Sequence, residues 1–525
     1  MIHTLTILAP EITLFVASCV VMVLGLSPAP AIRRQCGFLT VAALLVAGAL
    51  ALNGPRGATT LLPDILPFAK ATLALVGILL VLTASRTVDR DDEDAIDKGL
   101  TSFSAIRSTT AEFYAFLLFS LTGAMLCASA ADLVWLFLAL ELTSLPTYVM
   151  VVLSGRGREG FLRSQEAGVK YFFLGALAAA TFLYGFALLY GGTGATRFDD
   201  IAAHIATHGM GPIALAGMVL SILGISFKIA AVPMHFYTAD VYQGAASPVS
   251  AFLAFVPKTA GMLSILVLVS LMGWVSPQPD SGPATLPPVI DALLWLIAVI
   301  TMTVGNVLAT LQSSAKRMLA YSSIAHSGYM LAGVIAGPGD GSFTSSGVAA
   351  VLFYLLCYGV MNTGAFAVLA SLENRAGSEA ENLDDLRGLA RSHPVLGWSL
   401  ALCMLSLLGF PPILGFFAKV PLFTSALGGE RTMLVVALAL NSAIAAFYYL
   451  RVVALVLLDE PGPRPLLDAR VPSRVLVALI CAAGVIVLGL LGNPLMRASA
   501  RAARVAGPAH AAPISTHDAH AAEAH

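Results

Sequence analysis

Charged residues are scarce in this sequence. Only 11% of its 525 residues are Asp, Glu, Lys or Arg, whereas about 25% is usual in soluble globular domains. Hydrophobic residues make up 58%, and the mean hydropathy is +0.85. These proportions exclude a large soluble enzyme and predict a polytopic membrane protein. The formal net charge of -1 gives no sign of a nucleic-acid partner.

Cysteine is also scarce, and the six cysteines are scattered singly in or beside apolar stretches. The sequence contains no CxxC pair, no Cys/His cluster and no haem or nucleotide fingerprint. We therefore expect no disulfide framework, no metal site and no cofactor on this chain. The tail holds His517, His520 and His525, but its low complexity favours a disordered end over metal binding.

Long hydrophobic runs dominate the remainder of the sequence. About fourteen of them reach the roughly 20 residues that a helix needs to cross a bilayer, and their continuous apolar character favours helices over a β-barrel. The predicted fold class is an all-α polytopic membrane protein with about fourteen transmembrane helices. We place the spans at 5–27, 36–54, 64–85, 110–130, 132–153, 165–190, 212–237, 247–273, 288–311, 317–337, 346–371, 396–427, 433–458 and 473–495.

The spans divide the chain into groups of helices joined by short loops. Basic residues gather in the loops that follow odd-numbered spans, so the positive-inside rule places both termini on the outer side of the membrane. The first span has no basic segment before it, so we expect a retained helix rather than a cleaved signal. The groups are 1–109 for helices 1–3, 110–273 for helices 4–8, 288–458 for helices 9–13, 473–495 for helix 14, and 496–525 for a disordered polar tail.

Lysine is rare and unusually placed. Only two of the seven lysines lie in loops, whereas arginine is mostly confined to loops and span ends. A buried lysine can lose its proton but an arginine stays charged, so lysines inside spans favour groups that titrate. The lysines inside spans are Lys70, Lys170, Lys228, Lys258 and Lys419.

Four ionisable residues lie deep within their spans: Glu141, Lys228, Lys258 and Lys419. A charge at the bilayer centre costs roughly 2.5–3.5 kcal/mol on insertion scales, and such residues usually face a polar interior along an ion pathway. We therefore interpret these four as functional groups.

Other ionisable residues have a simpler alternative. Lys70 lies near a span end, where its ammonium group could snorkel to the interface. Glu166 and Lys170 are four residues apart, so a plain intrahelical pair explains them as well as a functional role does. Glu11 and Glu112 are near span ends and could be interfacial.

Prolines accompany two of the buried lysines. Pro233 follows Lys228 by five residues, and Pro411 and Pro412 precede Lys419. Proline removes a backbone hydrogen bond, and non-helical backbone at membrane depth persists only beside protein or water. The two interrupted spans are five apart in order, which is typical of transporters built from inverted repeats.

The tenth span, KRMLAYSSIAHSGYM, carries polar side chains between the lysines. Ser322 and His326 are four residues apart and share a helix face. With ordered water, His326 could relay a proton between ammonium groups, although a purely structural histidine remains the alternative. His235, which follows the break in the seventh span, is a weaker candidate.

Together, and in this order, several segments of the sequence resemble the antiporter-like membrane subunits of respiratory complex I. The DVYQGA segment is similar to the subunit N branch of bacterial NADH–quinone oxidoreductase rather than to subunits L or M. The similarity covers roughly residues 5–495. The segments are LELTSLPTYVMVVL, EAGVKYFFLGA, FKIAAVPMHFYTADVYQGAASPVSAFLAFVPKTAG, KRMLAYSSIAHSGYMLAG and GFPPILGFFAK.

This resemblance implies a proton-pumping subunit of the membrane arm of NADH:quinone oxidoreductase, in the bacterial inner membrane. It implies two inverted five-helix repeats, helices 4–8 and 9–13, with broken helices 7 and 12. NADH, FMN, iron–sulfur clusters and quinone are then expected on other subunits, and subunits K and M as neighbours. By position, the family's functional residues correspond to Glu141, Glu166, Lys170, Lys228, Lys258 and Lys419.

Three other functions fit the sequence less well. A subunit of a multi-subunit cation/proton antiporter or of a membrane-bound hydrogenase fits the lysines equally well, but the DVYQGA segment favours complex I. A membrane transferase would need a cluster of acidic or histidine residues in a loop, and no convincing cluster is present. A purely structural scaffold would not need five lysines inside its spans.

Overall fold

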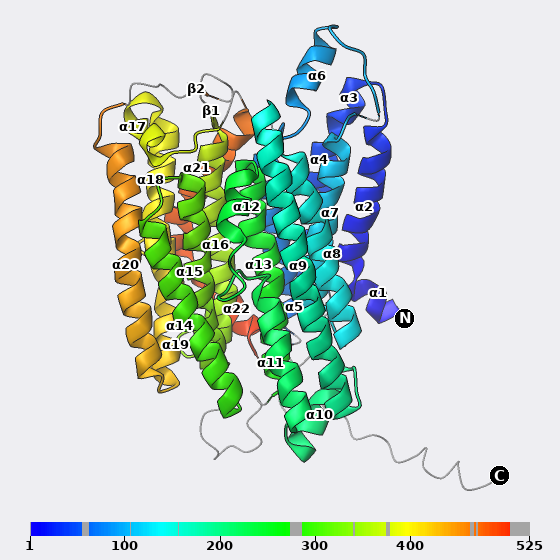
Figure 1. Cartoon of the computed structure of the whole chain (residues 1–525), viewed down its shortest axis with the longest axis vertical. Coiled ribbons are helices and arrows are strands. Elements are labelled where there is room, and N and C mark those ends of the chain that lie inside the picture. The colour runs from blue at the N-terminus through cyan, green and yellow to red at the C-terminus, as the bar shows by residue number, and fades with distance from the viewer. Residues whose placement is uncertain are drawn as a thin grey trace, which may run out of the picture.

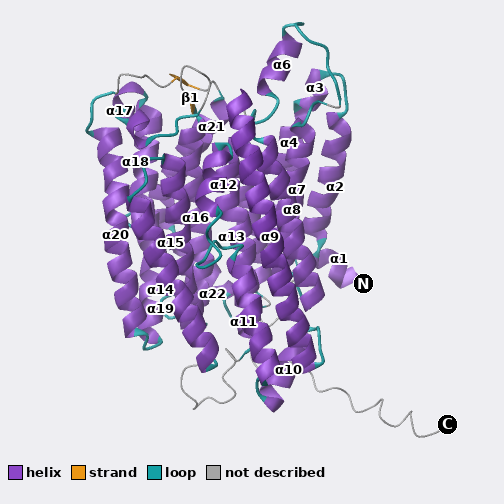
Figure 2. Cartoon of the chain, in the orientation of Figure 1, coloured by secondary structure: helices purple, strands orange, loops and turns teal. Residues whose placement is uncertain are grey.

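The computed structural model describes residues 2–54, 62, 64–105, 107–155, 157–272, 286–339, 342–373, 379–461, 467–468 and 471–504. These residues form a bundle of long helices that lie side by side (Figure 1). Helix dominates the described chain (Figure 2), which also contains one antiparallel pair of short strands, β1 (Leu372–Glu373) and β2 (Leu467–Asp468). We call the two ends of the bundle the α6 end, where β1 and α17 also lie, and the α10 end (Figure 1).

Ten helices of the described chain are long and apolar enough to cross a membrane, which confirms the all-α polytopic membrane class. The first of these spans joins α3 (Pro30–Arg33) to α4 (Gln35–Asn53). The others are α5 (Ile65–Thr83), α7 (Thr110–Ala128), α8 (Leu133–Leu153), α9 (Gly157–Thr193), α13 (Ser247–Ser270), α14 (Pro288–Thr310), α16 (Gly347–Ala370), α20 (Thr432–Leu457) and α21 (Pro472–Leu491).

The remaining helices are shorter or more polar. Four are apolar but short: α2 (Ala9–Gly25), α11 (Pro212–Ser226), α18 (Pro394–Leu408) and α19 (Leu414–Gly428). The others are α1 (Ile2–Ile7), α6 (Arg90–Asp97), α10 (Phe198–His208), α12 (Thr238–Gly244), α15 (Ala315–Ala336), the 3-10 helix η1 (Leu383–Leu386), α17 (Leu389–Ser392) and α22 (Asn493–Ala502).

Helices α13 and α16 form the core of the bundle. Every residue of both helices is buried, as expected for helices that are apolar on all sides. Helices α4, α9, α20 and α21 instead expose many large apolar side chains on the outside of the bundle, among them Phe38, Phe173, Phe447 and Leu490. This arrangement suits a bundle whose outer surface meets lipid or other membrane proteins.

Both predicted helix breaks are confirmed. Residues 227–237, with Pro233, separate α11 from α12, and residues 409–413, with Pro411 and Pro412, separate α18 from α19. Each break contains a cis X-Pro bond and a residue with positive φ, Ala230 in one and Gly409 in the other. The breaks expose backbone carbonyl groups inside the bundle, next to the buried lysines.

Arg474 fastens α21 to two other helices. Its side chain is fully buried, and its guanidinium group donates to the carbonyl oxygens of Thr83 at 3.1 Å and Ala370 at 2.6 Å, the last residues of α5 and α16. It also donates to the Ser85 carbonyl at 3.0 Å. A cation at helix C-termini satisfies carbonyls that lack helical partners and complements the helix dipoles.

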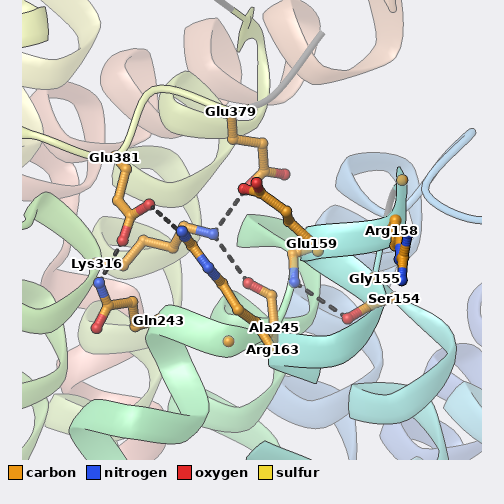
Figure 3. Close-up of a pocket in the computed structure, with 14 residues that line it drawn as sticks. Ser154, Gly155, Arg158, Glu159, Arg163, Gln243, Ala245, Lys316, Glu379 and Glu381 are labelled. Atoms are coloured by element: carbon orange, nitrogen blue, oxygen red, sulfur yellow. Dashed lines mark hydrogen bonds and ion pairs between the residues drawn. The ribbon is translucent and has the colours of Figure 1, made fainter. Parts of the chain in front are cut away.

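Glu379 fastens the segment after α16 to the α6 end of the bundle. Its carboxylate pairs with Lys316 of α15 at 2.9 Å and accepts from the backbone N–H of Ser247 at 2.9 Å, at the start of α13. Lys316 also donates to the Ala245 carbonyl at 2.9 Å (Figure 3). Burial raises the pKa of Glu379, but the charge of Lys316 and the bonds from Ser247 lower this pKa to about 2. The carboxylate is therefore charged at neutral pH.

The polar segments after α16 and after α21 contain further short helices. The segment AENLDDLRGLA forms η1 and α17, and Leu383, Leu386 and Leu389 are buried against the bundle. The tail was expected to be disordered from residue 496, but α22 continues to Ala502 and packs against α16. The tail histidines lie outside the described residues.

Arg474→Met should lower the stability of the protein by about 3 kcal/mol or more. Hydrogen bonds to a charged group each contribute about 1.5–3 kcal/mol, and the substitution leaves buried carbonyls without a donor. Arg474→Lys should restore only part of the loss, because an ammonium group cannot span separated carbonyls as a guanidinium fork does. Thermal unfolding of the purified protein checks this; equal midpoints for wild type and Arg474→Met would contradict it.

Glu379→Gln should destabilise the α6 end, because it leaves Lys316 as a buried charge without its partner. Loss of one partner of a buried pair costs about 3–5 kcal/mol. Since folding lowers the pKa of Glu379 from its ordinary 4.5, the contribution is complete above pH 4.5 and disappears as the pH falls towards 2. Thermal unfolding at pH 7 and pH 4 measures both effects. Glu159→Gln, at an exposed position in the first turn of α9, is the control.

Candidate functional site

The first buried lysine lies in the break between α11 and α12. The Lys228 ammonium group is 3.2 Å from a carboxylate oxygen of Glu141 and donates to the Ser144 hydroxyl, both on α8. The Lys228 side chain is only 1% exposed, whereas that of Glu141 is 19% exposed. The structure therefore brings together Lys228 and Glu141, two of the four ionisable residues predicted to be functional, with the carboxylate nearer the surface of the bundle.

A close approach of α13 brings the next lysine near this break. A methyl group on Gly261 of α13 would lie 2.9 Å from Cβ of Lys228 and 2.7 Å from Cγ2 of Ile229. Only glycine allows this contact. Three residues earlier on α13, the Lys258 ammonium group donates to both the carbonyl and the hydroxyl of Ser323 on α15, the hydroxyl at 2.6 Å. It also lies 4.8 Å from the centre of the Tyr358 ring.

Helix α15 connects the lysines to one another. Ser323 binds Lys258, and four residues later the Ser327 hydroxyl donates to the Ile229 carbonyl inside the first break. Between them His326 is held by two tyrosine hydroxyls, with Tyr354 2.6 Å from Nδ1 and Tyr449 2.9 Å from Nε2. A neutral imidazole has one donor and one acceptor nitrogen, so one tyrosine must donate and the other accept.

The last buried lysine lies at the second break. The Lys419 ammonium group donates at 2.7 Å to the carbonyl of Leu408, the last residue of α18. Carbonyls at a helix C-terminus carry partial negative charge, so this contact stabilises a cation. The Lys419 ammonium group also lies 5.1 Å from the centre of the Tyr329 ring, which in turn contacts the His326 ring at 5.7 Å.

An asparagine cluster supports this region. The amide of Asn306 donates to the Tyr329 hydroxyl at 2.8 Å and accepts from the Tyr448 hydroxyl at 3.1 Å. It also contacts Asn441 of α20 at 3.1 and 3.2 Å. These bonds fix the tyrosine against which Lys419 lies.

Glu166 and Lys170 are not part of this buried row. They form an ion pair of 2.7 Å on the outside of α9, where their side chains are 68% and 43% exposed. Lys170 also pairs with Asp240 of α12 at 3.1 Å, and Asp240 pairs with Arg317 of α15 at 2.7 Å. The pair that sequence reasoning proposed therefore belongs to a charged network at the α6 end.

Two adjoining cavities of about 350 and 380 Å³ open within this network, and Figure 3 shows the first of them. Both are lined by Arg163, Gln243 and Glu381, whose side chains point toward one another, and Arg163 pairs with Glu381 at 3.2 Å. Helix α12, which ends here, leads from the cavities to the break that holds Lys228. The cavities therefore lie at the α6 end of the row of lysines.

Lys70 does not snorkel to the membrane surface. Its ammonium group pairs with Glu11 of α2 at 2.8 Å and donates to the Ile7 carbonyl at 2.7 Å, and both charged side chains are almost fully buried. Glu11 also accepts from the hydroxyl of Ser129, the residue that follows α7, at 2.9 Å. The pair connects α2, α5 and α7, away from the row of lysines that begins at Lys228. His235 lies largely buried in the first break.

Sequence reasoning missed several partners of the lysines and of His326: Ser144 and Tyr358 for the lysines, and Tyr354 and Tyr449 for His326. Ser144 follows Glu141 by three residues, which is the spacing of neighbours on a helix face and a usable signal. Tyr354 and Tyr358 are four residues apart, but hydroxyls in apolar spans are too common to single them out. Among the described residues, no group of His, Cys, Asp and Glu is placed to hold a metal ion.

Comparisons with known proteins agree with this arrangement. Residues 130–445 match the protein family described as NADH:quinone oxidoreductase/Mrp antiporter, TM. The chain is 36% identical over 514 residues to NADH-quinone oxidoreductase subunit N 1 of Rhizobium meliloti (strain 1021), covering 96% of this chain and 98% of that protein.

Solved structures extend the comparison. A chain in respiratory complex I from Thermus thermophilus with bound aureothin is similar at TM-score 0.73 and 31% identity, covering 94% of this chain and 99% of that chain. A chain of the Mrp complex from Dietzia sp. DQ12-45-1b has TM-score 0.74 and 19% identity, with coverage of 96% and 97%. The Mrp similarity shows a shared fold.

Gly409→Ala should displace the Lys419 side chain and destabilise the protein. Gly409 has φ +89°, and an added methyl group would lie 2.9 Å from Cδ of Lys419. A side chain in the left-handed region costs roughly 1–2 kcal/mol, and the contact adds to this. Gly428→Ala at the end of α19 meets no atom within 4 Å and serves as the control. Thermal unfolding of both variants checks this; equal midpoints would contradict it.

Proposed function

Because the chain belongs to the subunit N family of NADH-quinone oxidoreductase, we propose that it moves protons across the membrane arm of that complex through its buried lysines. The oxidation of NADH and the reduction of quinone take place on other subunits in this proposal. The chain contributes Glu141, Lys228, Lys258, His326 and Lys419 as proton-carrying or charge-setting groups. It is expected to hold no redox cofactor of its own.

The observation that carries the proposal is a row of buried lysines with unequal partners. Lys228 has a carboxylate partner, whereas in the described part of the chain no ion pair joins Lys258 or Lys419 to a carboxylate. A buried charge without a counter-ion is costly. A lysine that is bound only by hydroxyl and carbonyl oxygens can therefore alternate between its charged and neutral forms.

Coupling in this proposal is electrostatic. An ion pair at about 4 Å contributes roughly 4 kcal/mol at an effective dielectric constant of about 20. If a neighbouring charge draws Glu141 away, Lys228 loses that stabilisation and gives up its proton towards Lys258. The proton then passes His326 and reaches Lys419, which releases it at the opposite side when a further charge repels it.

The finer architecture supports an alternating path. We propose fourteen transmembrane helices, with inverted repeats in residues 110–273 and 288–458, preceded by helices 1–3 and followed by helix 14. In Figure 1 the pair α11 and α12 runs up the view, whereas α18 and α19 run down it, as two halves of opposite orientation require.

The sidedness of the protein follows from its basic loops. We propose that the α6 end faces the bacterial cytoplasm, because the basic residues of its loops satisfy the positive-inside rule, and that both termini lie on the outer side of the inner membrane. The charged cavities beside α12 then serve proton uptake, with Glu166 and Lys170 at their edge. Subunits K and M are the proposed neighbours in the membrane arm.

Glu141→Gln and Lys228→Ala should each reduce coupled turnover of the assembled complex about tenfold or more. A factor of ten corresponds to about 1.4 kcal/mol, and removing the ion pair changes the free energy of charging Lys228 by more than this. NADH-driven proton uptake and quinone reduction in proteoliposomes measure the effect. Lys98→Ala, an exposed position beyond α6, is the control. Pumping at the normal proton-to-electron ratio in both variants would refute the proposal.

A further inference from the structure

One face of α16 lies beside His326 and Lys258. Its members recur every four residues and so lie one above another. Near the α10 end of this face, the Tyr354 hydroxyl lies 2.6 Å from Nδ1 of His326. Towards the α6 end, the Phe366 ring contacts Tyr242 of α12, with ring centres 6.3 Å apart. From the His326 contact to the Tyr242 contact, the members are Tyr354, Tyr358, Asn362 and Phe366.

The two middle members carry polar atoms that lack a partner. Tyr358 and Asn362 are 0% and 1% exposed, and within the described residues neither the Tyr358 hydroxyl nor the Asn362 amide nitrogen has a hydrogen-bond partner. Buried polar groups are almost always bonded, either to protein or to ordered water. Two such atoms one turn apart on a fully buried helix therefore indicate a hydrated position.

Lys258 lies beside this position. Its ammonium group is 4.8 Å from the centre of the Tyr358 ring, and its two hydrogen bonds both go to Ser323. An ammonium group has three donors, so one remains for a further acceptor. Water held by Tyr358 and Asn362 satisfies both that donor and the two unpaired polar atoms.

We propose that Tyr358 and Asn362 hold ordered water that supplies protons to Lys258 directly from the side of α12, in addition to the path through Lys228. In the transfer, an O–H bond of water breaks as an N–H bond forms on the neutral Lys258 amine. The oxygen that gave up the proton takes another from the next water toward α12, so no group is oxidised or reduced. This inference rests on the proposed function and adds two relay residues to it.

The geometry gives this path a direction. Phe366 separates Asn362 from the end of the face at the α6 end, where its ring meets Tyr242. Asn362 is thus the polar member of the face nearest to the half-helix α12. Tyr358, one turn further from α12, contacts both Lys258 and His326, and the centres of the Tyr358 and His326 rings are 5.0 Å apart. The two residues occupy the interval between the uptake side and the central lysine.

The test compares variants in the assembled complex, reconstituted in proteoliposomes. Asn362→Leu removes the amide, and we expect the proton-to-electron ratio to fall toward that of Lys258→Met. Asn362→Ser keeps a polar group and leaves room for water, so it should retain most of the pumping. Cys357→Ala changes an equally buried position of α16 outside this face and should pump as wild type.

Each outcome decides between the two proposals. If Lys258→Met lowers the ratio and Asn362→Leu does not, the water site is wrong and the proposed function stands. If Lys258→Met also pumps normally, the proposed function fails. Should Asn362→Leu not assemble, a high-resolution map of the wild-type complex replaces it. Water density within hydrogen-bond distance of both the Tyr358 hydroxyl and the Asn362 amide is expected, and dry contacts there would overturn the inference.

Discussion

The structure depends on how an ammonium group is stabilised inside a membrane bundle. Three lysines lie buried along one line, and each has a different partner: a carboxylate and a hydroxyl for Lys228, the carbonyl and hydroxyl of one serine for Lys258, and a helix-end carbonyl for Lys419. Each set of partners is enough to bind a cation. Only the first set contains a full negative charge, so the partners of Lys258 and Lys419 do not require those two lysines to stay charged.

Broken helices provide these partners. An intact helix uses its carbonyls internally, so a bundle of unbroken helices offers a buried ammonium group only side chains. The break after α18 frees the Leu408 carbonyl for Lys419, and the break after α11 places Lys228 itself on non-helical backbone beside α8. The prolines are therefore part of the electrostatic site, although they carry no charge.

Arginine in this protein has the opposite role. Arg474 is as buried as any lysine, but it binds the ends of α5 and α16 and cannot change its charge. Lys316 and Lys70 resemble it more than they resemble the central lysines, because each is paired with a carboxylate outside the row, Glu379 and Glu11 respectively. In the proposed mechanism, this division lets charge move along the central row while the helices around it stay fixed.

Composition and spacing alone predicted the membrane class and both breaks, because burying apolar surface and breaking helices at proline are local effects. They left the roles of Lys70, Glu166 and Lys170 open, and the structure pairs Lys70 with Glu11 and exposes Glu166 and Lys170. Depth along a span is readable from sequence, but the direction in which a side chain faces is decided by helix packing. The tyrosines around His326 and the unpaired amide of Asn362 belong to that second category, since only the tertiary structure brings α15, α16 and α20 together.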